Sequence, residues 1–202
     1  CRCEIEVQGE GCGEDGLDHD FRDLAVETEF GRQRDNAAVI DGEKFLATRE
    51  FALTAVATPG HTSNHLCVSM DTEGALFTGD HVMQGSTVVI TPPDGDMGAY
   101  LRSLEGLDTL AMTAIAPGHG HLIEQPHDEA RRLIAHRLKR EQKVVDGFAA
   151  KNPATLDELV PVVYADTPVK LHGAARRSLY AHLLKLEAEQ RVSQTDGCWR
   201  LL

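Results

Sequence analysis

The sequence contains the tripeptide Pro-Gly-His twice, at Pro59-Gly60-His61 and at Pro117-Gly118-His119, and each copy follows a short apolar stretch. With 8 Pro, 18 Gly and 10 His among 202 residues, chance predicts about 0.04 such tripeptides. Glycine after proline allows a sharp turn, which holds the next side chain at the mouth of a sheet. We therefore expect both histidines to act as ligands or bases; the alternative is that their hydrogen bonds only stabilise a turn.

A carboxylate occupies the same kind of position between the two tripeptides. Phe77-Thr-Gly-Asp80 is again an apolar stretch that ends in glycine and then an acidic residue. Two imidazoles and one carboxylate form a ligand set suited to Zn²⁺, Mn²⁺ or Fe²⁺. Asp80 alone would more often cap a turn, but beside His61 and His119 it is predicted to be a metal ligand.

The pattern around these residues predicts a mixed α/β fold. Short β-type stretches, including 24–28, 37–40, 44–46 and 51–56, run up to Thr78. Beyond Asp96, which is placed to cap a helix, leucines recur at helical spacing. A buried strand at 113–116 and a long amphipathic helix at 128–148 follow.

The last fifty residues predict a second, smaller domain. Lys151-Asn-Pro153 ends the long helix, because proline lacks the amide proton that a helix needs. A capping-box helix start at 155–160, a helix at 174–190 and two strands around the turn Gln194–Gly197 complete a winged helix-turn-helix. We therefore expect domains at 1–150 and 151–202.

These motifs resemble those of the metallo-β-lactamase fold hydrolases. The third, fourth and fifth metal motifs of that family are similar to Thr58–Thr62, Phe77–Asp80 and Ala116–Gly120. Within the family, Gly79–Met83, Pro92–Leu101 and the terminal winged helix resemble the β-lactamase-like protein 2 branch. The resemblance implies an αββα sandwich, represented mainly by its C-terminal half, in the domain at 1–150.

The resemblance also implies a site for two zinc ions, or for Mn or Fe. His61 would bind the first ion and His119 the second, and Asp80 would bridge both as the catalytic residue. A metal-bound hydroxide would then attack the substrate. Ser86 and Thr87 are predicted to line the cleft if they are not simply turn residues. His65 would support the ligands, while His81 should point to the opposite face from Asp80.

The chain departs from the family because the H-x-H-x-D-H motif, which supplies the other ligands, is absent. His19 lacks the spacing to replace it, and a cluster of Cys1, Cys3 and Cys12 would be a weak soft-metal motif. The sequence therefore looks like a fragment, or like one numbered without its first half. We expect fewer than two metals per chain, and homo-oligomers that cover the open sheet face.

The composition of the chain favours some binding partners and cellular compartments over others. The formal charge of −12 argues against a surface that binds nucleic acid over its whole face. With 42% hydrophobic residues and no long apolar run, neither disorder nor a membrane span is expected. Five cysteines and no secretory signal favour a cytoplasmic protein.

Residues 151–202 carry a formal charge of only +1. Arg176, Arg177 and Lys185 on the predicted recognition helix are candidates for phosphate contacts. A neutral module nevertheless lacks the basic surface of a free DNA-binding domain. A lid or packing role is therefore the favoured hypothesis for the winged helix.

Two classes of function follow. The first is a hydrolase acting on a small-molecule ester, thioester or lactone, or on single-stranded RNA, since the resembling branch includes endoribonucleases. The second is a winged-helix module that binds nucleic acid or protein and carries an inactive sandwich remnant. Cleavage of β-lactams is the least favoured, because a cytoplasmic chain would not meet them.

Overall fold

The structure, a computed structural model, describes Gly42 and residues 44–202, which belong to one compact unit. The predicted strands at 24–28 and 37–40 lie outside the described residues, as do Cys1, Cys3, Cys12 and His19.

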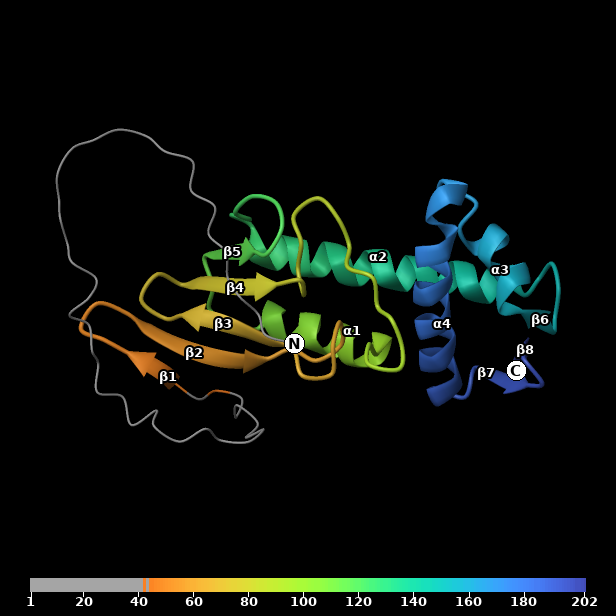
Figure 1. The fold of residues 1–202 in the computed structure, drawn as a ribbon, viewed down its shortest axis with the longest axis horizontal. Helices are drawn as coiled ribbons and strands as arrows, with labels where there is room; N and C mark the ends of the chain where they lie inside the picture. Colours follow the sequence, from red (N-terminus) through yellow and green to blue (C-terminus); the bar gives the residue numbers. More distant parts are fainter. Residues whose placement is uncertain (1–41, 43) are drawn as a thin grey trace. The chain divides into compact units, whose positions relative to one another are not determined.

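Five strands form one sheet (Figure 1). They are β1 (Lys44–Ala47), β2 (Ala52–Ala57), β3 (Leu66–Met70), β4 (Ala75–Gly79) and β5 (Ala114–Pro117), in that spatial order. Neighbours from β1 to β4 are antiparallel, whereas β5 runs parallel to β4. These strands confirm the mixed α/β fold predicted from the sequence.

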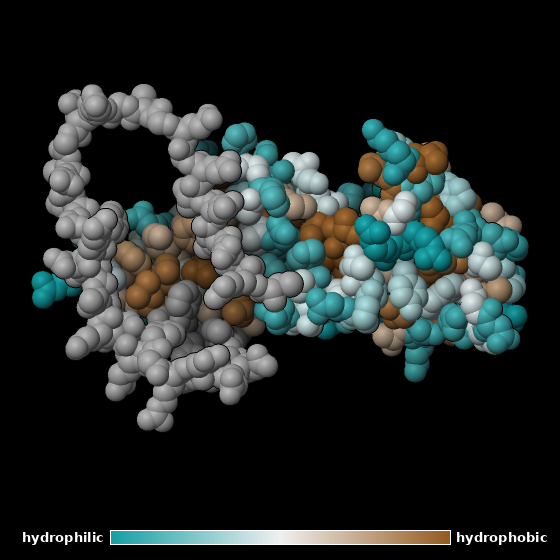
Figure 2. Space-filling model, in the orientation of Figure 1, coloured by the Kyte–Doolittle hydropathy of each residue, from teal (hydrophilic) through white to brown (hydrophobic). Residues whose placement is uncertain are grey.

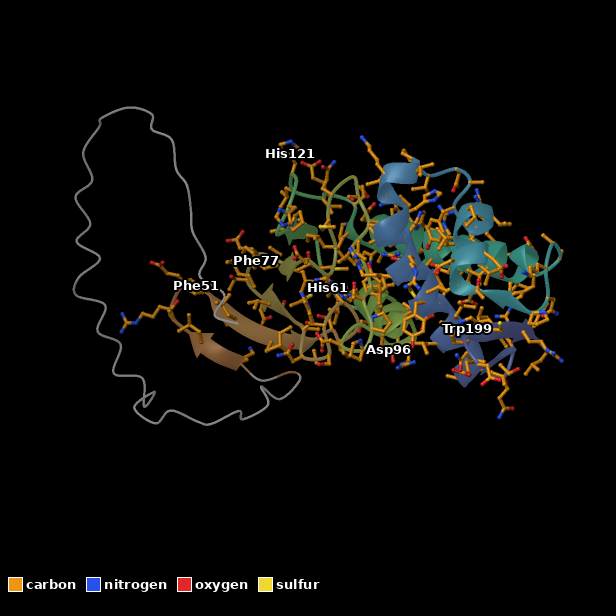
Figure 3. All side chains as sticks on the ribbon, turned by 45° about the vertical axis from the view of Figure 1, so that its right-hand side comes forward. Phe51, His61, Phe77, Asp96, His121 and Trp199 are labelled. Carbon is orange, nitrogen blue, oxygen red and sulfur yellow. The ribbon has the colours of Figure 1, made fainter. Side chains whose placement is uncertain are left out.

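Two helices cover one face of the sheet. Successive strand residues point to opposite faces, so Leu76 is 1% exposed and its neighbour Phe77 is 42% exposed. The Leu76 side packs against α1 (Met97–Asp108) and α2 (Pro126–Gly147), with Tyr100 and Leu133 in the same apolar cluster. Phe77 is labelled in Figure 3, and apolar residues are visible around the strands in Figure 2.

Helix α1 begins as the sequence predicts. Asp96 accepts a hydrogen bond from the Ala99 amide at 2.7 Å, which satisfies one of the free N–H groups of the first turn. Its three leucines at 101, 104 and 107 are all buried. In the chain, α1 lies between β4 and the parallel strand β5 and forms the connection between them.

The C-terminal part has the winged-helix pattern. Its elements are β6 (Ala154–Thr155), α3 (Leu156–Val163), the 3-10 helix η1 (Val169–Leu171), α4 (His172–Ala188), β7 (Val192–Thr195) and β8 (Cys198–Leu201). Thr155 and Glu158 form the predicted capping box. The hairpin turn is shorter than the predicted Gln194–Gly197, because β7 extends through Thr195 and only Asp196 and Gly197 adopt positive φ.

Helix α2 joins two apolar clusters. Leu133 lies in the sheet cluster, while Val144 and Phe148, at the other end, lie in a cluster with α3, α4 and the wing. None of the helices within residues 44–202 combines the length and apolarity that crossing a bilayer requires. The domain boundary near residue 150 stays a prediction.

A buried ionic group connects α2 to α4. Glu141 of α2 lies 2.8 Å from Lys185 Nζ, 3.0 Å from Arg191 Nη1 and 3.7 Å from His182 Nδ1. Burial alone would raise the pKa of Glu141, but His182 and Lys185 outweigh burial and lower that pKa to about 2. His182 is fully buried, and its burial lowers its own pKa.

This group predicts acid sensitivity. Ionised Glu141 stabilises the fold above pH 4.5, and that contribution is lost as the pH falls toward about 2. Neutral His182 acts in the same direction, because its stabilisation begins to be lost below pH 6.5. We expect the free energy of unfolding in urea to decrease steadily from pH 7 to pH 3.

Glu141→Gln should flatten the part of this dependence below pH 4.5 and cost on the order of 2 kcal/mol at pH 7. Glu105→Gln, which removes an exposed carboxylate of α1, is the matched control and should leave the dependence unchanged. An unaltered pH profile in the Glu141 variant would contradict the assignment.

Candidate metal site

The strand directions bring three predicted side chains to one edge of the sheet. Strand β3 is antiparallel to both β2 and β4, so β2 and β4 run the same way, and β5 follows β4. The carboxyl ends of β2, β4 and β5 therefore share an edge. His61, Asp80 and His119 follow these ends within a few residues.

Asp80 lies close to both histidines. Its Oδ2 is 3.9 Å from His61 Nε2, and its Oδ1 is 3.3 Å from His119 Nε2. Each carboxylate oxygen thus faces a different imidazole, as in a carboxylate shared by two ions. The side chain of His61 is 26% exposed, whereas those of Asp80 and His119 are 47% and 73% exposed.

A backbone carbonyl orients the His61 ring. Its Nδ1 lies 3.2 Å from the carbonyl oxygen of Val89, so Nδ1 carries the proton and donates it. This tautomer leaves the Nε2 lone pair directed toward the Asp80 side. A hydrogen bond on the other ring nitrogen is the usual way that proteins orient a ligating histidine.

Helix α1 supports the His61 loop through close backbone contact. Gly60 has a φ of +140°, and a Cβ placed on it would lie 2.3 Å from Tyr100 Cα. The Asp96 amide donates to the Gly60 carbonyl at 2.9 Å, and Ser103 donates to the Pro59 carbonyl at 2.7 Å. Figure 3 labels His61 and Asp96 at these neighbouring loops.

The ends of β4 and β5 are equally close. The Gly118 amide donates to the Gly79 carbonyl at 2.8 Å, and a Cβ on Gly118 would lie 3.0 Å from the Gly79 carbonyl carbon. The glycines before Asp80 and His119 thus allow the two backbones to approach, which brings the carboxylate and the imidazole together.

Two further histidines lie behind the site. His65 Nδ1 is 2.8 Å from Thr58 Oγ1, and the support of the ligands by His65 that the sequence suggests stays a prediction. His81 is fully buried between the rings of His65 and Tyr100, at centroid distances of 5.4 and 4.9 Å. Burial, and then the nearby imidazoles, lower the pKa of His81 to about 3, so it stays neutral.

The donor set fits zinc as part of a shell. Imidazole nitrogen and carboxylate oxygen are zinc ligands, and a shared carboxylate suits a pair of ions. Within Gly42 and residues 44–202, however, no group of three or more His, Cys, Asp or Glu side chains converges closely enough to hold a metal ion. The described residues thus supply part of a ligand set.

The other predicted site residues differ in their surroundings, and a place for Ser86 and Thr87 in the cleft stays a prediction. Ser86 is exposed and Thr87 is half-buried, in the loop after Gly85. Arg176 pairs with Asp157 at 2.6 Å. The side chain of Lys185 is only 13% exposed, because it faces Glu141 instead of solvent.

Arg177 is exposed, as is Arg176. Phosphate contacts by these three cations stay a prediction.

Sequence reasoning missed two residues, Tyr100 and Arg137. Tyr100 Oη donates to the carbonyl of His81, and Arg137 donates to the carbonyl of Val88. Arg137 falls four residues after Leu133, on the stripe that α2 buries. A cation on an apolar stripe is the pattern that could have identified it.

Comparison with known protein families identifies the class. Residues 7–119 match the family described as "Metallo-beta-lactamase superfamily", and residues 155–199 match "Beta-lactamase associated winged helix domain". The chain belongs to the metallo-beta-lactamase superfamily. Its fold class and the winged helix expected from the sequence are confirmed.

Several curated relatives have matching stretches. The Drosophila melanogaster "Beta-lactamase-like protein 2 homolog" is 37% identical over 139 residues, or 68% of this chain and 46% of that protein. The "Atrochrysone carboxyl ACP thioesterase" of Aspergillus fumigatus is 29% identical over 142 residues, or 65% of this chain and 44% of that protein. The chain spans about half the length of these relatives.

Solved structures agree on the fold. A metallo-beta-lactamase family protein from Thermus thermophilus superposes with a TM-score of 0.70 at 24% identity, over 81% of this chain and 53% of that one. A beta-lactamase domain protein from Burkholderia ambifaria gives a TM-score of 0.69 at 20% identity, over 81% and 51%.

The contact between Gly60 and Tyr100 yields a stability prediction. Gly60→Ala should lower the free energy of unfolding by about 2 kcal/mol or more, because the new methyl group meets backbone and the positive φ is strained. Gly106→Ala is the control, since that site in α1 is open and helical. It should stabilise by roughly 0.5–1 kcal/mol. Equal urea midpoints for the two variants would contradict the prediction.

Proposed function

We propose that the chain serves metal-dependent hydrolysis, with His61, Asp80 and His119 as ligands of zinc, or alternatively of Mn or Fe. The observation that carries the proposal is Asp80, whose two oxygens face the Nε2 atoms of the two histidines at 3.9 and 3.3 Å. One carboxylate between two imidazoles suits a shared ligand.

Each residue has a separate task in this proposal. The Val89 carbonyl holds the His61 ring so that Nε2 is free to bind. Asp80 neutralises positive charge between the two positions, and neutral His81 fills the space behind it without adding charge. The Lewis acidity of bound zinc lowers the pKa of water and stabilises negative charge that develops on the substrate.

The three ligands supply about half of what two ions need, since each ion takes roughly three or four protein donors. The remaining donors must come from outside the described residues. We propose that the site is complete only with the part of the family fold that the matched relatives have in addition.

For the substrate, we propose an ester or thioester with an apolar acyl part. One relative carries a thioesterase name. A cavity of about 730 Å³ lies between the start of α1 and α4, with Met97, Leu101 and Leu184 in its lining. The backbone amide of Asp96, in the same lining, donates to the Gly60 carbonyl, so the cavity adjoins the His61 loop.

RNA is the weaker substrate hypothesis. Arg176 and Lys185 are engaged in ion pairs, and residues 151–202 carry a formal charge of only +1. Polyanion binding depends on Lys and Arg side chains that neutralise phosphates. We propose instead that the winged helix packs beside the cavity and limits access to it.

Removing the shared carboxylate tests the ligand assignment. Asp80→Asn keeps the size of the side chain but removes its charge, and should weaken zinc binding roughly 10- to 100-fold in calorimetric titration. Asp71→Asn is the matched control. Asp71 lies on the turn after β3, and its exposed carboxylate pairs with Lys44 of β1. It should bind zinc like the unmodified chain. Equal loss in both variants, or in neither, would refute Asp80 as a ligand.

Metal content tests the completeness of the site. We expect the 202-residue chain to bind fewer than two zinc ions and to form oligomers in sedimentation. A chain carrying H-x-H-x-D-H should gain metal and activity. Two ions and full activity in a monomer would contradict the partial site. No metal in either chain would favour an inactive sandwich with a binding winged helix.

The substrate class is tested separately. Hydrolysis of S-acyl pantetheine would support the thioester class, and cleavage of single-stranded RNA would overturn it.

A further inference from the structure

Arg137 is a buried cation in the middle of α2. It is 4% exposed, and within the part of the chain that the structure describes its guanidinium forms no ion pair. Burying a charge without a counterion is costly unless other groups compensate. Arg137 instead donates from Nη2 to the Val88 carbonyl and lies over the Tyr100 ring, 5.3 Å from its centroid.

The first of these contacts leads to His61. Val88 directly precedes Val89, whose carbonyl accepts the hydrogen bond from His61 Nδ1. The stretch 88–91 belongs to no helix or strand, so no ladder of backbone hydrogen bonds holds it. Val88 and Ile90 are buried, the Val88 carbonyl accepts from Arg137, and the Thr91 carbonyl accepts from the Gly95 amide at 2.9 Å.

The second contact leads to the Asp80 loop. Tyr100 Oη donates to the carbonyl of His81, the residue after Asp80, at 3.0 Å. The backbone of the same tyrosine packs against Gly60, next to His61. Arg137 therefore touches a support of the His61 loop and a support of the Asp80 loop.

We propose that Arg137 is a positioning residue of the candidate metal site. From α2 it holds the Val88–Val89 segment, and through the Val89 carbonyl it sets the tautomer and rotation of the His61 ring. The inference deepens the proposed function and rests on it for the metal, but the orientation of His61 is a property of the chain alone.

Arg140 provides an internal comparison. One turn further along α2, it donates to the Val163 carbonyl at 2.7 Å and lies over the Tyr164 ring at 4.4 Å. It also pairs with Asp166 at 2.8 Å. The two arginines thus make the same kinds of contact, but Arg140 supports only the winged-helix cluster.

The test uses the whole 202-residue chain and two readouts. Proton–nitrogen NMR correlation of the histidine rings should show the Nδ1–H tautomer at His61 in the unmodified protein. Arg137→Met should convert it to a mixture or to Nε2–H, and should weaken zinc binding about 10-fold or more. Arg140→Met should lower the melting temperature while leaving both readouts unchanged.

A conservative variant guards against loss of folding. Arg137→Lys keeps a cationic donor for the Val88 carbonyl and should restore at least part of the Nδ1–H tautomer. An unchanged His61 tautomer in the Met variant would show that Arg137 is merely structural. If the Met variant does not fold, Arg137→Gln, which shortens the side chain and removes its charge, takes its place, and an unchanged tautomer there would show the same. If the tautomer responds but the unmodified chain binds no zinc, the proposed metal site fails while the positioning role stands.

Discussion

The common direction of β2, β4 and β5 is the constraint on which the site depends. Because their carboxyl ends share one edge, residues far apart in the sequence meet there. The close backbone contacts at Gly60 and between Gly118 and Gly79 then decide how near the three side chains come. A side chain at either Gly60 or Gly118 would push these loops away from their supports.

Helix α2 contributes buried residues to both apolar clusters. Arg137 and Arg140 each turn a buried or half-buried guanidinium toward a backbone carbonyl and an aromatic ring. Glu141, the next residue of α2, forms ion pairs with Lys185 of α4 and with Arg191, which follows α4. The winged helix is thus tied to the same helix that supports the His61 segment.

This arrangement explains why the winged helix has so little free positive charge. Arg176, Lys185 and Arg191 are directed to carboxylates of the winged helix or of α2, whereas Arg177 is exposed. The Phe77 side of the sheet is exposed, because within the described residues α1 and α2 pack only on its other side. Apolar faces of sheets in globular domains are normally buried against another layer of structure.

The sequence by itself determined the strands, the helix caps and three residues of the candidate site, because apolar periodicity, Asp96, the Thr155 capping box and Pro-Gly-His are local patterns. It could not place His81 between two rings, bury His182, turn Lys185 inward or assign a role to Arg137. Those outcomes depend on which faces of α1, α2 and α4 pack together. Packing brings together residues such as Arg137 and Val88, which are 49 positions apart, and no local pattern contains that information.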